Sequence, residues 1–170
     1  MHLTNRETWT LIHGMILGTL FLLAFAGGLA GLYSLRPELV TAEGIRERVR
    51  RLIFGTSAMA ILAWATVITG TWIVYPWYRE KTPTSAKEIL LANPDTANWH
   101  DFGMEWKEHI AWFAPILATV AAYLVIYYRG DLARSNKLRM LVIVIFTLAF
   151  ATAAVAGLFG ALITKAAPVQ

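Results

Sequence analysis

The chain contains no cysteine among its 170 residues. This absence excludes disulfide bonds, thiolate-ligated metal clusters and haem attached covalently through a C-x-x-C-H motif. Charged side chains are also scarce, because they make up 15% of the residues whereas hydrophobic residues make up 57%. A soluble domain needs more polar surface than this composition supplies, so the sequence predicts an integral membrane protein.

Four long stretches of the sequence contain no Asp, Glu, Lys or Arg. Each is close to or longer than the roughly 20 residues that a helix needs to cross the hydrocarbon core of a bilayer. The stretches are residues 9–33, 52–78, 110–128 and 140–164. We therefore predict an all-α fold with a single domain, residues 1–170, that forms an integral membrane antiparallel four-helix bundle with an elaborated loop between helices 2 and 3.

The basic residues indicate an orientation in the membrane. Nine of the fifteen Lys and Arg residues lie in two short connections, residues 34–51 and 129–139. By the positive-inside rule these connections face the cytoplasm of a bacterial-type cytoplasmic membrane, and both termini and the 79–107 loop are extracytoplasmic. Because the basic residues flank the apolar stretches, the expected partner is the lipid bilayer and not nucleic acid.

Three local patterns refine the helix boundaries. Thr41 precedes a segment whose charges alternate at helical spacing, so the second helix is predicted to begin well before its apolar part. Ser85 and Glu88 form a capping-box pattern ahead of an apolar run, which predicts a short amphipathic helix within the 79–107 loop. Pro115 predicts a kink in the third apolar stretch.

Small residues recur at helical spacing in the first and last apolar stretches. In lipid, such residues let helix backbones approach closely, so we predict tight helix contacts along both faces. The residues are Gly14, Gly18, Gly27, Gly28 and Gly31 in the first stretch, and Ala149, Ala153, Ala156, Gly157, Gly160 and Ala161 in the last.

Two histidines, His13 and His109, lie at the outer ends of the first and third apolar stretches. An ionisable group at membrane depth is energetically expensive, so a functional role is the default hypothesis. In the predicted topology both stretches run in the same direction. His13 follows Trp9 by four residues and His109 follows Trp106 by three, which places both imidazoles roughly 5 Å below an aromatic anchor. We predict that the two histidines ligate one shared cofactor.

The neighbours of these histidines favour haem among the groups that imidazole can ligate. A haem plane needs broad apolar walls, and apolar or small residues share the helical faces of both histidines. They are Gly14, Leu17, Trp112, Phe113 and Ile116. With these features the chain resembles a small four-helix membrane b-type cytochrome subunit. The resemblance implies one haem b, with His13 and His109 as axial ligands, that carries electrons between quinone and an extracytoplasmic redox partner, so the chain itself need not be an enzyme.

Other interpretations stay open. His100, in the loop, is either a solvated or hydrogen-bonded side chain or the ligand of a second, surface-lying haem. Together with Asp101, Glu105, Glu108 and His109 it also permits a non-haem metal site, although the other apolar stretches supply no carboxylate for a di-iron bundle. A further alternative is a cofactor-free anchor or scaffold that holds other membrane or extracytoplasmic subunits in a larger complex.

Overall fold

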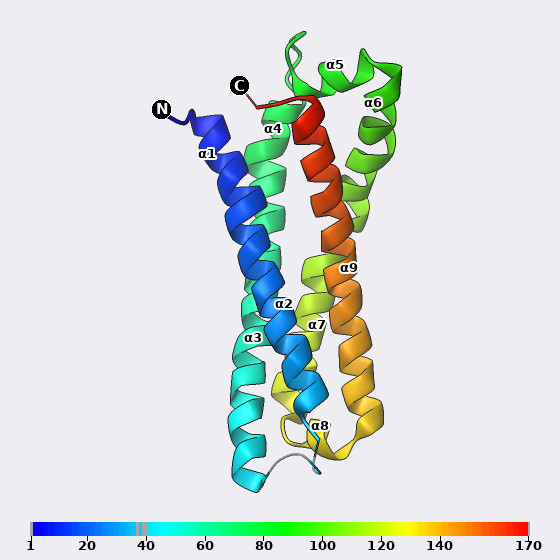
Figure 1. Cartoon of the computed structure of the whole chain (residues 1–170). Helices are drawn as coiled ribbons and strands as arrows, with labels where there is room; N and C mark the ends of the chain where they lie inside the picture. Colours follow the sequence, from blue (N-terminus) through cyan, green and yellow to red (C-terminus); the bar gives the residue numbers. More distant parts are fainter. Residues whose placement is uncertain (1, 37, 39–40, 170) are drawn as a thin grey trace.

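The computed structural model describes residues 2–36, 38 and 41–169, and within this part all regular structure is helical. Four helices are long and apolar enough to cross a membrane, namely Asn5–Ser34, Ala42–Tyr78, Pro94–Tyr128 and Asn136–Ala166. The predicted all-α class and the four apolar helices are confirmed. Figure 1 shows both termini at the same end of the molecule as α5 and α6. We call this end the terminal end and the other, where α8 lies, the basic end.

The first two long helices each contain a π-helical turn. The first consists of α1 (Asn5–Leu11), the π-helical turn η1 (Ile12–Ile16) and α2 (Leu17–Ser34). The second consists of α3 (Ala42–Thr69), the π-helical turn η3 (Gly70–Val74) and α4 (Tyr75–Tyr78). The Thr41 hydroxyl caps α3 by accepting a hydrogen bond from the Gly44 N–H at 3.2 Å. The predicted early start of this helix is therefore confirmed.

The third long helix begins earlier than the sequence predicts. It consists of α6 (Pro94–Asn98), the π-helical turns η4 (Trp99–Met104) and η5 (Trp106–Ile110), and α7 (Phe113–Tyr128). The helix starts at Pro94 because the Asn93 side chain accepts from the Asp95 N–H and so caps a new helix. The predicted short helix in the preceding connection is confirmed as α5 (Ala86–Leu91), which Ser85 caps.

Pro115 costs α7 no hydrogen bond. It is the third residue of α7, and the first N–H groups of a helix have no partner within the helix. The missing N–H of proline is therefore tolerated there, and the regular helix is interrupted just before it, at Ala111 and Trp112. The interruption lies three and four residues before Pro115, where the proline ring disturbs the preceding turn. After α7, the short α8 (Asp131–Arg134) leads into α9 (Asn136–Ala166).

Two separate clusters of buried apolar side chains hold the helices together. The larger one lies toward the basic end and includes Leu32, Met59 and Phe146, all 0% exposed, from α2, α3 and α9. The smaller one lies at the terminal end and joins α4, α5, η4 and α9. Its buried members are Tyr78, Leu90, Met104, Ile163 and Ala167. The helices therefore pack against one another toward both ends of the molecule.

Glycine allows close helix contact in the larger cluster. A Cβ atom added at Gly28 would lie 2.7 Å from Cζ of Phe146, and one added at Gly55 on α3 would lie 4.0 Å from the Gly28 backbone. The predicted tight contact is thus confirmed at Gly28. The adjacent Gly27 differs, because no atom of the described residues would lie within 4 Å of a Cβ there.

This difference predicts opposite effects for alanine at two neighbouring glycines. Gly27→Ala should keep or raise stability, since alanine favours a helix over glycine by about 1 kcal/mol. Gly28→Ala should lower it by about 1–3 kcal/mol, because the added methyl group overlaps the fully buried ring of Phe146. Thermal unfolding of both variants in the same detergent measures the difference. Equal stability of the two variants would contradict the packing described for α2.

Candidate cofactor site

A cavity of about 970 Å³ lies between the two clusters. Phe21 and Ala63 of the larger cluster and Met104 and Ile163 of the smaller cluster line its two ends. Residues of α1, η1 and α2 form one side and residues of α9 the other, while α3, η3, η5 and α7 complete the wall. Its volume is near the upper end of the range of about 300–1,000 Å³ that is common for small-molecule and cofactor sites.

Small residues create the width of this cavity. The first long helix contributes Gly14 and Gly18, and α9 contributes Ala153, Ala156, Gly157, Gly160 and Ala161. A Cβ atom at Gly14, Gly18 or Gly157 would meet no atom of the described residues within 4 Å. The prediction of tight helix contact is therefore wrong at these three glycines, because each faces open space between the two clusters.

His13 lies in η1 and lines the cavity. Its Nδ1 atom is 3.1 Å from the hydroxyl oxygen of Thr69. That hydroxyl has a single proton, which it donates to a backbone carbonyl, of Ala65 at 2.8 Å or of Thr66 at 3.1 Å. With that proton donated to a carbonyl, Thr69 accepts from His13, and in this tautomer Nδ1 carries the imidazole proton and Nε2 keeps a free lone pair.

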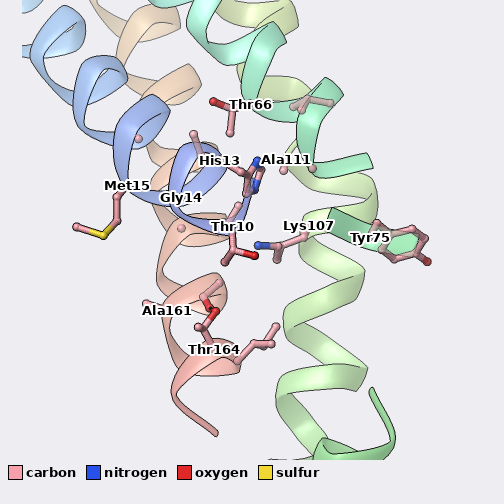
Figure 2. A pocket seen from close by; sticks show the side chains of 18 of the residues that line it. Thr10, His13, Gly14, Met15, Thr66, Tyr75, Lys107, Ala111, Ala161 and Thr164 are labelled. Atoms are coloured by element: carbon pink, nitrogen blue, oxygen red, sulfur yellow. Dashed lines mark hydrogen bonds between the residues drawn. The ribbon is translucent and has the colours of Figure 1, made fainter. Parts of the chain in front are cut away.

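Gly70 provides the space that the His13 ring occupies. A Cβ atom at Gly70 would lie 2.8 Å from Cε1 of His13 and 3.4 Å from Nε2, so a larger residue would displace the ring. Figure 2 shows the ring directed from η1 toward the helices that carry Thr66 and Ala111. The imidazole is thus held by a hydrogen bond on one nitrogen and by close packing along one edge.

His109 does not join His13. Its side chain is 67% exposed, and its Nδ1 atom lies 3.2 Å from a carboxylate oxygen of Glu105 on the same helix. It is absent from the residues that line the cavity, whereas Lys107 and Glu108 of the same π-helical turn line it. The predicted pair at matched depth is therefore not brought together, because η5 turns the His109 side chain to the outside of the molecule.

Of the five residues predicted to form the walls of a haem site, two line the cavity and three do not. Gly14 and Trp112 line the cavity, and the Trp112 ring also packs edge-on against the rings of Trp64 and Trp72. Three others do not line it: Leu17 is half-buried, Phe113 is 52% exposed and Ile116 is 47% exposed. Of the predicted cofactor-binding residues, the structure thus brings together His13, Gly14 and Trp112.

His100 lies outside the cavity and contacts the smaller cluster. Its Nδ1 atom is 2.7 Å from the hydroxyl of Tyr78, a buried residue of that cluster. In the part of the chain that the structure describes, no three His, Cys, Asp or Glu side chains form a group that could hold a metal ion. The residues considered for a non-haem metal site, His100 to His109, are therefore not assembled into one.

Two polar side chains of the cavity were not predicted from the sequence. Lys107 extends from η5 to α9, where a Cβ atom at Gly160 would lie 2.9 Å from its Nζ atom. Thr10 has a buried hydroxyl oxygen without a hydrogen-bond partner. Figure 2 shows the Lys107 ammonium and the Thr10 hydroxyl directed toward one another. The helical period of the sequence gave no signal for Lys107, which lies between Trp106 and Glu108 in a segment assigned to the loop.

Tyr75 and Arg79 lie at the side of the cavity. Tyr75 is among the lining residues, and Figure 2 shows its ring directed away from Lys107. The Arg79 guanidinium donates a hydrogen bond to the Tyr75 hydroxyl, and this bond raises the pKa of Arg79 above its ordinary value. Arg79 therefore stays charged, with its charge directed toward Tyr75.

Comparison of the chain with protein-family models, with curated proteins and with solved structures gives no match. The function is therefore argued from the geometry of the cavity. That geometry combines one imidazole, two lysine, two glutamate and five hydroxyl side chains with walls made otherwise of apolar and small residues.

Proposed function

We propose that the chain is a membrane electron-transfer subunit that holds one haem b in this cavity, with His13 as an axial ligand. The observation that carries the proposal is the His13 imidazole, which lines a large, mainly apolar cavity and has its Nδ1 atom 3.1 Å from the Thr69 hydroxyl. Histidines that ligate metals commonly donate their other ring N–H to a fixed acceptor, as His13 donates to Thr69. A bound haem would supply one-electron chemistry between quinone and an extracytoplasmic redox subunit.

The proposal includes insertion of the four helices in a bacterial-type membrane as an antiparallel bundle. Large apolar side chains on the outside support it, since Leu23, Phe54 and Ile61 are each more than 60% exposed. Both termini lie at the end opposite to the connections that hold nine of the fifteen basic residues. If the basic end faces the cytoplasm, the cavity lies in the extracytoplasmic half of the bilayer.

The proposal assigns one axial ligand where the sequence predicted two. A haem held by His13 fits three features of the cavity, namely its volume, its glycine-lined sides and the ring of Trp112. His109 cannot supply a second ligand from its outward position beside Glu105. The proposal therefore places the haem against His13 and makes no use of His109 or His100.

A spectrum of the purified protein tests this proposal. The protein, in neutral detergent, is mixed with an equimolar amount of haemin, freed of excess haemin on a column, and measured before and after reduction with dithionite. We expect a reduced-minus-oxidised spectrum of the b type that saturates at one haem per chain. A protein that stays folded by circular dichroism but binds no haem would contradict the proposal and would favour the cofactor-free anchor.

A further inference from the structure

Lys107 and Thr10 form a polar region of the cavity beside His13. Lys107 and Thr10 reach it from different helices, η5 and α1, and their polar atoms are directed toward one another. Trp106 fixes the position of the lysine, because its indole N–H donates to the Thr152 carbonyl on α9 at 3.2 Å and so fastens η5 to that helix. The two polar groups therefore have defined positions.

Neither group is satisfied by the protein. Among the described residues, no ion pair and no side-chain hydrogen bond involves Lys107, and the buried Thr10 oxygen has no hydrogen-bond partner. Two carboxylates line the cavity but do not pair with the lysine, and that of Glu7 is bound to the Thr4 N–H at 2.7 Å. An ammonium group facing an apolar cavity is costly unless an anion pairs with it.

We propose that Lys107 and Thr10 bind the carboxylate of an acidic amphiphile whose apolar body fills the rest of the cavity. The ammonium supplies the charge and the Thr10 hydroxyl supplies a second donor, which together match the acceptors of one carboxylate. Small residues of α2 and α9 and the Trp112 ring supply apolar surface for the body of the ligand. The proposal uses the same cavity as the proposed function and names the chemical class of its occupant.

Two sources could supply such a carboxylate. One is the haem itself, which carries carboxylates at one edge of its apolar ring. The other is a free fatty acid from the bilayer. Figure 1 shows α1 and the end of α9 diverging toward the terminal end, and residues of both helices line the cavity. A ligand could thus enter between them.

The test compares each acid with its uncharged counterpart. Metal-free protoporphyrin IX is titrated against its dimethyl ester, and palmitic acid against hexadecanol, with binding measured by fluorescence and by thermal shift. Both porphyrins lack iron, so their binding does not depend on ligation by His13. The variants are Lys107→Met and Thr10→Val. Lys137→Met, which removes an exposed lysine at the opposite end of α9, is the matched control.

We expect the native protein and Lys137→Met to bind at least one acid about tenfold or more tightly than its counterpart, since a charge-assisted hydrogen bond contributes about 1.5–3 kcal/mol. Lys107→Met should lose this preference and Thr10→Val should reduce it. A preference for protoporphyrin IX over its ester identifies haem as the source of the carboxylate, and a preference for palmitic acid over hexadecanol identifies a fatty acid. The proposal is overturned if neither pair shows it or if Lys107→Met retains it. Haem ligation is read separately from the iron spectrum, so either proposal can fail without the other.

Discussion

His13→Ala should abolish the haem b spectrum, and His109→Ala should leave it intact. The His13 imidazole lines the cavity, and its Nδ1 atom lies 3.1 Å from the Thr69 hydroxyl oxygen. Alanine at this position removes the one histidine that lines the cavity in the described part of the chain. The His109 ring, in contrast, faces outward and lies beside Glu105. Titration of each purified variant with haemin, followed by the reduced-minus-oxidised spectrum, measures the difference.

A chemical control separates loss of ligation from loss of folding. His13→Gly should regain part of the spectrum when imidazole is added, because the free imidazole can occupy the space beside Gly70 that the ring has left. Because imidazole also ligates free haemin, the spectrum is measured on haem that stays with the protein on the column, and unfolded protein would retain none. Loss of the spectrum in both His13→Ala and His109→Ala would show that the two histidines ligate together, and would contradict the outward orientation of His109.

The sequence was sufficient to predict the fold at the level of its helices. The absence of charge over four stretches located the four helices that are long and apolar enough to cross a membrane, and side-chain caps located two helix starts, at Thr41 and Ser85. These features are local, since a hydroxyl group that accepts from an N–H three residues later needs no information about the rest of the chain. The start at Pro94 was not predicted, because the residues before the third apolar stretch were assigned to the 79–107 loop.

The sequence could not predict which way His109 faces. Its depth follows from the rise per residue, but its direction depends on the turns between Trp99 and Ile110, which are π-helical. Each π-helical turn contains more residues than an α-helical turn and rotates everything that follows. An α-helical count gave His109 the same depth as His13 but not the direction of its side chain. The same π-helical turn contains Lys107, which lines the cavity and was overlooked.

The small residues show a second limit of prediction from sequence, because the same spacing of small residues leads to close packing at one place and to open space at another. Gly28 faces the ring of Phe146 and permits close packing, whereas Gly157 faces open space. The spacing of small residues along one helix is the same in both cases. What differs is the residue on the neighbouring helix that faces the glycine, and that residue depends on how the helices pack in the whole molecule. The cavity could therefore not be predicted from the small residues alone.

Gly157→Leu should close the cavity without destabilising the protein. A side chain at Gly157 would project into open space, since no atom of the described residues lies within 4 Å of a Cβ there, and leucine favours a helix over glycine by up to about 1 kcal/mol. The added atoms would occupy volume that a bound haem requires. Ala154→Leu is the matched control, because Ala154 lies on the same helix but is exposed and does not line the cavity.

Haem and protoporphyrin titrations of the two leucine variants, together with their thermal unfolding, complete this experiment. We expect Ala154→Leu to bind like the native protein and Gly157→Leu to bind about tenfold or more weakly, since overfilling a packed site costs about 1–3 kcal/mol. Gly157→Leu should unfold at or above the native temperature, and Ala154→Leu should unfold close to it. Native affinity in Gly157→Leu would show that the ligand lies elsewhere. A large loss of stability in Gly157→Leu would show that α9 packs closely at Gly157, where the structure places open space.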